Sequence, residues 1–244
     1  MVSILVGLGL QAHGDEVADL IKKSDAFDRQ LKTSESLAVL LDAEKIAPNN
    51  AEVLWRIARQ NGLSMDDVAD KNGKRDRAQK ALEFAKKAVA ADGNNANAHL
   101  ALAVSYGRVA PFLDNKTKIA YSKLVKEEAD KALKLDSSND LCYHVLGAWN
   151  YEMANLNSVL RLIASAVYGS FPPASNEAAV EDFKKAAALN PNRLANFVEL
   201  GRSYAALKQN ALAAENLKKG LSMPNREKDD EASKERAREA LKKL

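Results

Sequence analysis

The fold is decided by the segment from Leu200 to Pro224, which reads LGRSYAALKQNALAAENLKKGLSMP. Small residues occur where two antiparallel helices would approach closely, at Gly201, Ala205, Ala213 and Gly220. Larger residues at helical spacing are expected to fill the space between the helices: Leu200, Tyr204, Leu212, Leu217 and Leu221. The segment therefore predicts a helix hairpin, which cannot bury its apolar face without stacked neighbours.

The same pattern returns three more times along the chain. Its first helices share an apolar anchor position, occupied by Ile57, Leu102, Leu146 and Leu200, at intervals of 45, 44 and 54 residues. A short asparagine-containing stretch precedes each of these helices: Asn49-Asn50, Asn94-Asn95, Ser138-Asn139 and Pro191-Asn192. The pattern resembles the tetratricopeptide repeat, whose standard unit is about 34 residues long. We therefore expect an all-α, tetratricopeptide-like α-solenoid, a right-handed superhelix, with insertions between paired helices near residues 62–74, 108–118 and 155–175.

The ends of the chain differ from the repeats. We expect residues 1–14 to form a flexible N-terminus and residues 15–244 to form one helical-repeat domain, closed by a charged C-terminal capping helix. The apolar run from Ile4 to Leu10 is much shorter than the roughly 20 residues that span a bilayer. We therefore expect no transmembrane segment in this chain.

Composition narrows the choice of partners. A formal net charge of +3 is too small to favour nucleic acid. The single cysteine, Cys142, excludes an internal disulfide and favours a reducing compartment. Lysines crowd one region, where a solvated helix face and a basic patch are both possible: Lys116, Lys118, Lys123 and Lys126.

The sequence offers no pattern typical of catalysis. His13, His99 and His144 lie far apart and form no metal-ligand pair at helical spacing. Cys142 and His144 are two residues apart, which places them on different faces of a helix. We therefore expect a non-enzymatic protein with no catalytic residues, metal or cofactor.

In tetratricopeptide folds the first helices line a concave surface, and positions on that surface follow from the register of the anchors. The predicted groove residues are Trp55, Arg59, Asn97, Leu100, Val104, Leu141, His144, Ala148, Tyr151, Val198 and Arg202. One interpretation is an apolar floor, bordered by Arg59 and Arg202, that receives an amphipathic helix, an extended peptide or a lipid chain. The other is that Leu100, Leu141 and Val198 belong to the core.

Two further features bear on the ligand. Some tetratricopeptide domains hold a C-terminal carboxylate with lysine and asparagine on the first helices, but here those positions hold Trp55, Arg59, Leu100 and Val104, which disfavours a chaperone-tail receptor. The insertion from Ser158 to Phe171 is apolar around most of a helix. We expect it to fold onto the solenoid, and a membrane-surface role is the alternative.

Several segments together resemble the regulator of microtubule dynamics family. They are Leu54 to Arg59, Lys118 to Tyr121 with Val125 to Leu135, Leu146 to Trp149, and Tyr168 to Ser175 leading into Ala179 to Pro191. The resemblance covers the chain from about Ala18 to its end. This chain departs from longer relatives in two features, an N-terminal membrane anchor and an acidic, phenylalanine-containing docking tract. We therefore expect no membrane tether in this chain.

The resemblance implies a scaffold that binds microtubules or a protein partner in the cytoplasm, associated with the cytoskeleton. It also implies a place at mitochondria for some relatives, which would apply here if a targeting segment has been removed. The alternative that it implies is a phospholipid-binding or lipid-transfer module at membrane contact sites. We prefer microtubule association, because lysine clusters could meet the acidic tails of tubulin.

Overall fold

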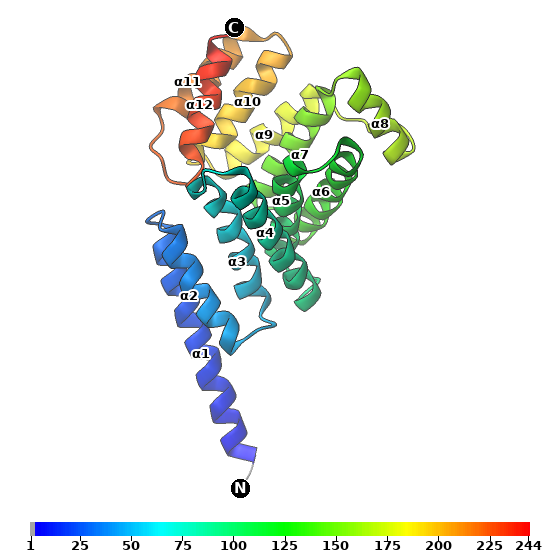
Figure 1. Cartoon of the computed structure of the whole chain (residues 1–244). Helices are drawn as coiled ribbons and strands as arrows, with labels where there is room; N and C mark the ends of the chain where they lie inside the picture. Colours follow the sequence, from blue (N-terminus) through cyan, green and yellow to red (C-terminus); the bar gives the residue numbers. More distant parts are fainter. Residues whose placement is uncertain (1–2) are drawn as a thin grey trace. The chain divides into compact units, whose positions relative to one another are not determined.

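The structure is a computed structural model that describes the backbone of residues 3–244 and side chains from Gly14 onwards (Figure 1). By its contacts the chain divides into two compact units, one ending at Ser105 and the other running from Tyr106 to Leu244. The single domain expected over residues 15–244 stays a prediction. The flexible segment expected at residues 1–14 falls almost entirely outside the described side chains and also stays a prediction.

The first unit consists of paired helices. Its elements are α1 (Ser3–Asp28), α2 (Thr33–Ile46), α3 (Ala51–Leu63), the short 3₁₀ helix η1 (Ser64–Asp67), α4 (Lys71–Ala91) and the start of α5 (Ala96–Val109). Helix α1 packs on α2, α2 on α3, and α3 on α4. The core between them is built around Leu40, Val53 and Ile57, which are buried.

The second unit contains the end of α5 and seven further α-helices. Its elements are η2 (Ala110–Phe112), α6 (Asn115–Leu135), α7 (Asp140–Ala154), α8 (Ser158–Tyr168), α9 (Asn176–Leu189), α10 (Leu194–Ala206), α11 (Asn210–Ser222) and α12 (Asp230–Leu241). Helix α7 pairs with α9 and α10 with α11, while α12 packs on both α10 and α11. No strand occurs within residues 3–244.

The repeats are joined by one recurring turn. After α4, α6 and α9, the side chain of Asp92, Asp136 or Asn190 accepts a hydrogen bond from the backbone N–H two residues later. Asn95 then accepts from the N–H of Ala98, and Asn139 from that of Leu141. These side chains cap the start of the next first helix, which explains why asparagines mark the register in the sequence.

The hairpins α1/α2 and α10/α11 carry no insertion and close with the same tight turn. The N–H of Lys32 bonds to the carbonyl of Phe27, and the N–H of Gln209 bonds to that of Tyr204, each at 3.0 Å. Leu31 and Lys208 both have φ of 59°, the left-handed conformation that glycine usually takes at a helix end. Each turn therefore holds local strain of about 1–2 kcal/mol.

The paired helices approach most closely at glycines. A Cβ atom on Gly201 would lie 2.7 Å from Cγ of Leu217 and 3.0 Å from the carbonyl oxygen of Ala213. A Cβ on Gly147 would lie 3.1 Å from atoms of the Phe183 ring. Contacts this short leave no room for a side chain, so glycine sets the distance between the helices of these pairs.

Helix α8 occupies the longest predicted insertion and packs on α6 rather than between α7 and α9 (Figure 1). Its Ala164 joins a cluster with Ile119, Trp149 and Met153. The outer face keeps two large apolar side chains in solvent, since Val159 is 63% and Leu162 74% exposed. The expectation that this segment folds onto the helical repeats is therefore correct for one face of the helix.

One residue of the defining segment is placed differently from our prediction. Leu212 was expected between α10 and α11, but it is 42% exposed. It lies in the first turn of α11 and lines an open hollow together with Tyr204 and Leu207. The prediction for Leu212 was wrong because the helices are closest farther along, at Gly201 and Leu217.

We expect the substitution Gly201→Ala to lower the free energy of unfolding by about 1–3 kcal/mol, because the added methyl group overlaps Leu217 and the backbone of Ala213. Gly107→Ala in α5 is the matched control, since a Cβ there meets nothing within 4 Å. It should leave stability unchanged or raise it by up to about 1 kcal/mol. Urea unfolding followed by circular dichroism checks both, and equal effects would contradict the close approach.

Candidate functional site

In the first unit the predicted groove residue Trp55 lies in a hydrogen-bonded group on α3. Its indole N–H donates to Oε2 of Glu52 at 3.1 Å, and the guanidinium of Arg56 lies 4.2 Å from its ring centre. The other oxygen of Glu52 accepts from Asn95 at 2.8 Å. Burial opposes the charge on Glu52, but hydrogen bonds from Asn95, Arg56 and Trp55 outweigh it and lower the pKa of this carboxyl.

The charge of Arg59 is already compensated within the first unit. Its Nη1 lies 2.6 Å from Oδ2 of Asp28 at the end of α1, and Gln60 donates to the other oxygen of Asp28 at 2.8 Å. Asn97 and Val104 on α5 are half-buried, and Leu100 is buried. Arg59 therefore joins α3 to α1 through its pair with Asp28, and its charge does not border an open groove unpaired.

In the second unit a polar layer joins α7 to α10. Nδ1 of His144 lies 2.7 Å from Oδ1 of Asn196, which is fully buried, and the amide of Asn196 donates to Asp140 at 3.4 Å. Nε of Arg193 lies 2.7 Å from Oδ2 of Asp140, an ion-pair contact without hydrogen-bond geometry. Burial lowers the pKa of His144, although Glu199 and the bond to Asn196 favour its charged form.

The same layer continues through Glu199, which is buried on α10. Its carboxylate receives Arg202 from the same helix and Arg236 from α12, whose Nε lies 3.1 Å away. The guanidinium of Arg202 also lies 4.8 Å from the ring centre of Tyr151 on α7. The structure therefore brings together three predicted groove residues, His144, Tyr151 and Arg202, with polar partners that we did not predict.

A sequence signal for those partners existed. Asn196, Glu199 and Ser203 are polar and lie on one face of α10 at helical spacing, and all three are buried. A polar stripe at core positions requires partners on a facing helix, because buried polar groups without hydrogen bonds are costly. Here α7 supplies partners for Asn196 and α12 one for Glu199, while Ser203 donates to the backbone carbonyl of Glu199 in its own helix.

Two predicted groove residues belong to the core. Val198 is fully buried. A Cβ atom added to Gly220 of α11 would lie 2.7 Å from its Cγ2. Val198 packs in one cluster with Leu194 of α10 and Ala237 of α12. Leu100 is 6% exposed. Of the two interpretations given for Leu100 and Val198, their burial therefore favours the core and not an open groove, and α12 takes part in covering Val198. Leu141 and Ala148 are half-buried, and Ala148 packs against a core cluster that includes Val180 and Phe183 of α9.

The thiol of Cys142 is not available for chemistry in this structure. The side chain is fully buried on α7. Burial first, and then the charges of Asp136 and Asp140, raise its pKa to about 12. A thiol with this pKa stays neutral at physiological pH and is a poor nucleophile.

The four predicted basic residues lie on α6 but differ in their surroundings. Lys116, Lys118 and Lys123 are exposed, and Lys123 lies 5.9 Å from the ring centre of Tyr168. Lys126 is half-buried, pairs with Asp130 at 2.7 Å and lies over the ring of Trp149. Three of the four are therefore available to an acidic partner.

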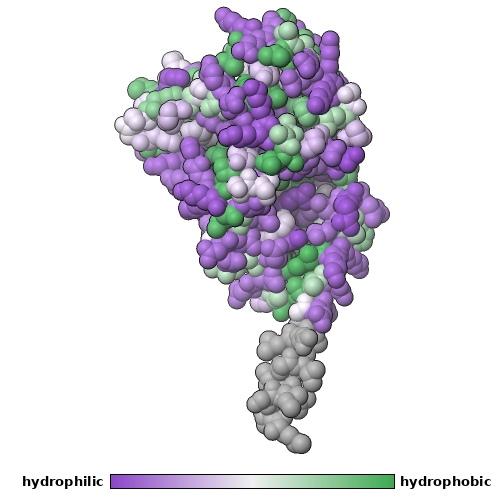
Figure 2. Space-filling model, turned by 180° about the vertical axis from the view of Figure 1, so that it is seen from behind, coloured by the Kyte–Doolittle hydropathy of each residue, from purple (hydrophilic) through white to green (hydrophobic). Residues whose placement is uncertain are grey.

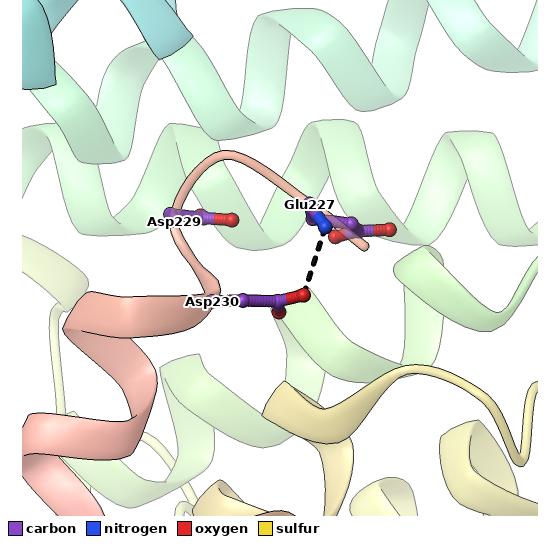
Figure 3. Close-up of side chains that lie close together, drawn as sticks. All are labelled: Glu227, Asp229 and Asp230. Atoms are coloured by element: carbon purple, nitrogen blue, oxygen red, sulfur yellow. Dashed lines mark hydrogen bonds between the residues drawn. The ribbon is translucent and has the colours of Figure 1, made fainter. Parts of the chain in front are cut away.

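Three carboxylates, those of Glu227, Asp229 and Asp230, come together before and at the start of α12 (Figure 3). Oδ2 of Asp230 accepts from the backbone N–H of Arg226 and of Glu227. Arg193 pairs with Glu227 at 2.9 Å, and Arg108 lies 3.7 Å from Asp229. Oδ1 of Asp230 is buried without a hydrogen-bond partner, but backbone N–H groups and two arginines contact the other carboxylate oxygens. We therefore assign the group to shaping the loop before α12 and place no metal there.

Apolar surface is limited in the described parts. A hollow of about 290 Å³ between α9, α10 and α11 is lined by Val180, Tyr204, Leu207 and Leu212 with charged neighbours, and none of the predicted groove residues lines it. On the face drawn in Figure 2, hydrophobic residues form small patches separated by hydrophilic ones. Within the described residues, no helix has the length and hydropathy needed to cross a membrane.

Comparison with known proteins identifies the relatives of this chain. The family described as regulator of microtubule dynamics protein 1-3 matches residues 20–244. Regulator of microtubule dynamics protein 3 of Xenopus laevis is 31% identical over 222 residues, which cover 90% of this chain and 48% of that protein. Protein 1 of Bos taurus is 30% identical over 233 residues, covering 93% and 72%. The chain thus spans about half the length of the first of these relatives.

A solved structure gives the fold independently. A thermophilic tetratricopeptide-repeat protein of Thermus thermophilus matches with a TM-score of 0.65 at 16% identity, covering 92% of this chain and 98% of that one. Likeness at this identity establishes the fold alone. The predicted all-α, tetratricopeptide-like class is confirmed.

We expect the stability of the second unit to fall as the pH is lowered from about 7 to about 5. The folded state holds His144 with a pKa below its usual 6.5, so its neutral ring contributes stability that is complete above 6.5 and is lost as the pH falls through the lowered pKa. Urea unfolding at stepped pH measures this. His144→Gln should flatten the dependence, and an equally steep fall in that variant would contradict the assignment.

Proposed function

The chain belongs to the regulator of microtubule dynamics family, and we propose that it is a non-enzymatic helical-repeat scaffold that associates with microtubules in the cytoplasm. Membership of the family is the observation that carries the proposal. The tetratricopeptide-like fold supports it, because stacked helix hairpins present extended surfaces that bind proteins. Activity, location and partner of the whole protein are part of the proposal.

The contact that we propose for the microtubule is the exposed part of α6, formed by Lys116, Lys118 and Lys123. Among the described side chains, no carboxylate lies within ion-pair distance of these three ammonium groups. The acidic tails of tubulin offer the opposite charge, and attraction between exposed charges acts over about 8 Å at physiological salt. Lys126 contributes less, because Asp130 already neutralises it.

For the faces of the first helices we propose a protein partner. The apolar floor that a lipid chain would need is reduced, because Leu100 and Val198 are buried. What remains around Trp55 in one unit and around Tyr151 and Arg202 in the other is aromatic and polar, with its charges paired. Such surfaces suit hydrogen bonding and stacking with a polypeptide.

Phospholipid binding is the second candidate, and one observation favours it. Val159 and Leu162 stand in solvent on the outer face of α8, beside Arg161, which lies over the ring of Phe171. An apolar stripe next to a cation can enter a membrane surface. The stripe holds two large residues, which is little area for stable insertion, so we rank this function below microtubule association.

Co-sedimentation with microtubules tests the proposal. The chain should pellet at low salt and be released as salt rises. The variant Lys116→Gln/Lys118→Gln/Lys123→Gln should bind about tenfold more weakly, if each exposed charge contributes about 0.5 kcal/mol. A chain that does not pellet at low salt, while circular dichroism shows it folded, would contradict the proposal.

The control carries the same loss of charge outside α6: Lys218→Gln/Lys242→Gln/Lys243→Gln, all exposed. It should bind like the unmodified chain. Equal weakening of both variants would assign binding to net charge and not to α6. A parallel arm with anionic liposomes, in which Leu162→Ser removes binding while microtubule pelleting fails, would favour the lipid function instead.

A further inference from the structure

Helix α8 carries an apolar stripe on its solvent-exposed face. Val159, Leu162 and Ala166 follow one another at intervals of three and four residues, so they lie on one side of the helix. All three are exposed, and Val159 and Leu162 are the two most exposed large apolar side chains among the described residues. The other side of the helix packs on α6. We call these three residues the α8 stripe.

The hollow between α9, α10 and α11 is a second apolar surface that is open to solvent. Val180 and Tyr204, which line it, are nearly buried, whereas Leu207 is half-buried and Leu212 is 42% exposed. An apolar cavity of about 150 Å³ already holds a benzene molecule. A hollow of about 290 Å³ therefore has room for a leucine side chain.

Charges of opposite sign border the stripe and the hollow. Arg161 is exposed and directly precedes Leu162 on α8, while Glu177 lines the hollow from the first turn of α9. Among the side chains described from Gly14 onwards, neither Arg161 nor Glu177 has an oppositely charged group within ion-pair distance. The other two charged residues of the hollow, Glu181 and Lys184, pair with each other at 3.0 Å. The stripe thus has an available cation beside it, and the hollow has an available carboxylate.

We propose that the α8 stripe of one molecule binds in the hollow of a second copy of this chain. Leu162 enters the hollow and covers Leu212, which removes the apolar surface of both from water. Arg161 meets Glu177 at the border, and this pair fixes the direction in which α8 lies. Leu162 does not occupy the hollow of its own molecule, because it is 74% exposed. Each molecule therefore presents both surfaces to another copy.

The size and symmetry of the contact determine the kind of assembly that we expect. Stable interfaces bury about 1,200–2,000 Å² in total, and a stripe of three side chains buries much less, so the association is weak. The stripe and the hollow are different surfaces. Two molecules can therefore exchange both contacts in a symmetric dimer, or several can join head to tail.

A membrane surface fits the α8 stripe less well than a second copy does. A helix that lies in a membrane surface carries several cations along its polar face. Arg161 is the only charged residue of α8. The chain itself supplies an apolar hollow with a carboxylate at its border, which matches both features of the stripe.

Sedimentation velocity of the full chain tests the proposal at concentrations from about 10 μM to about 1 mM, the range of weak association. The mean mass should rise with concentration. Leu162→Glu and Leu212→Glu should each raise the dissociation constant at least about tenfold, because each places a charge in an apolar contact. Leu41→Glu on α2 is the matched control, since Leu41 is also exposed, and it should stay within about twofold of the unmodified chain.

A mixture of the two variants gives the sharpest result. The Leu162→Glu chain keeps an intact hollow, and the Leu212→Glu chain keeps an intact stripe. An equimolar mixture should therefore form a heterodimer through one contact, although neither variant associates alone. Circular dichroism confirms that each variant is folded.

Several results would overturn the proposal. They are an unmodified chain that stays monomeric over the whole range, equal weakening by Leu41→Glu, and a mixture that stays monomeric while the unmodified chain associates. If the chain is monomeric and binds anionic liposomes in a manner that Leu162→Glu abolishes, the stripe belongs to a membrane surface and the assignment is wrong.

The inference goes beyond the proposed function, and the two fail separately. Sedimentation of the chain alone contains no microtubules, so self-association can be found when pelleting with microtubules fails. A monomeric chain that pellets with microtubules supports the proposed function and contradicts self-association.

Discussion

The close approach of two helices in each repeat is the constraint on which the rest of the second unit depends. Gly201 lets α10 pack directly against Leu217 and the backbone of α11, and Gly147 lets the ring of Phe183 lie against α7. These contacts fix the distance and rotation of each pair. The faces that remain on α7 and α10 are consequently held in a defined orientation, where His144 reaches Asn196 and Tyr151 reaches Arg202.

In this arrangement charged residues of the first helices form ion pairs within the chain, and these pairs hold helices together. Glu199 gathers Arg202 and Arg236 and so attaches the capping helix to the polar layer. In the first unit Asp28 pairs with Arg59 and so joins α1 to α3. The exposed Lys116, Lys118 and Lys123 of α6 take no part in such pairs, which is why we assign the electrostatic contact to α6 and not to the first helices.

The sequence was sufficient for features that depend on local chemistry. Asparagines at repeat boundaries marked the register because they cap the next helix, and glycines marked the helix contacts because a larger residue there would force its neighbours to shift. Features set by distant partners could not be read in the same way. Val198 is covered by a helix about 40 residues later in the chain, and Arg59 is neutralised by a residue in α1. The polar residues on one face of α10 were visible in the sequence, but the residues of other helices that they contact were not.

In the second unit α7 pairs with α9 as one repeat, while α8 is attached to α6. Native-state amide hydrogen exchange, followed peptide by peptide, tests it most directly. We predict that α7 and α9 lose protection together and that α8 exchanges earlier, under milder conditions. Protection of α8 equal to that of α7, with α9 opening independently of both, would contradict it.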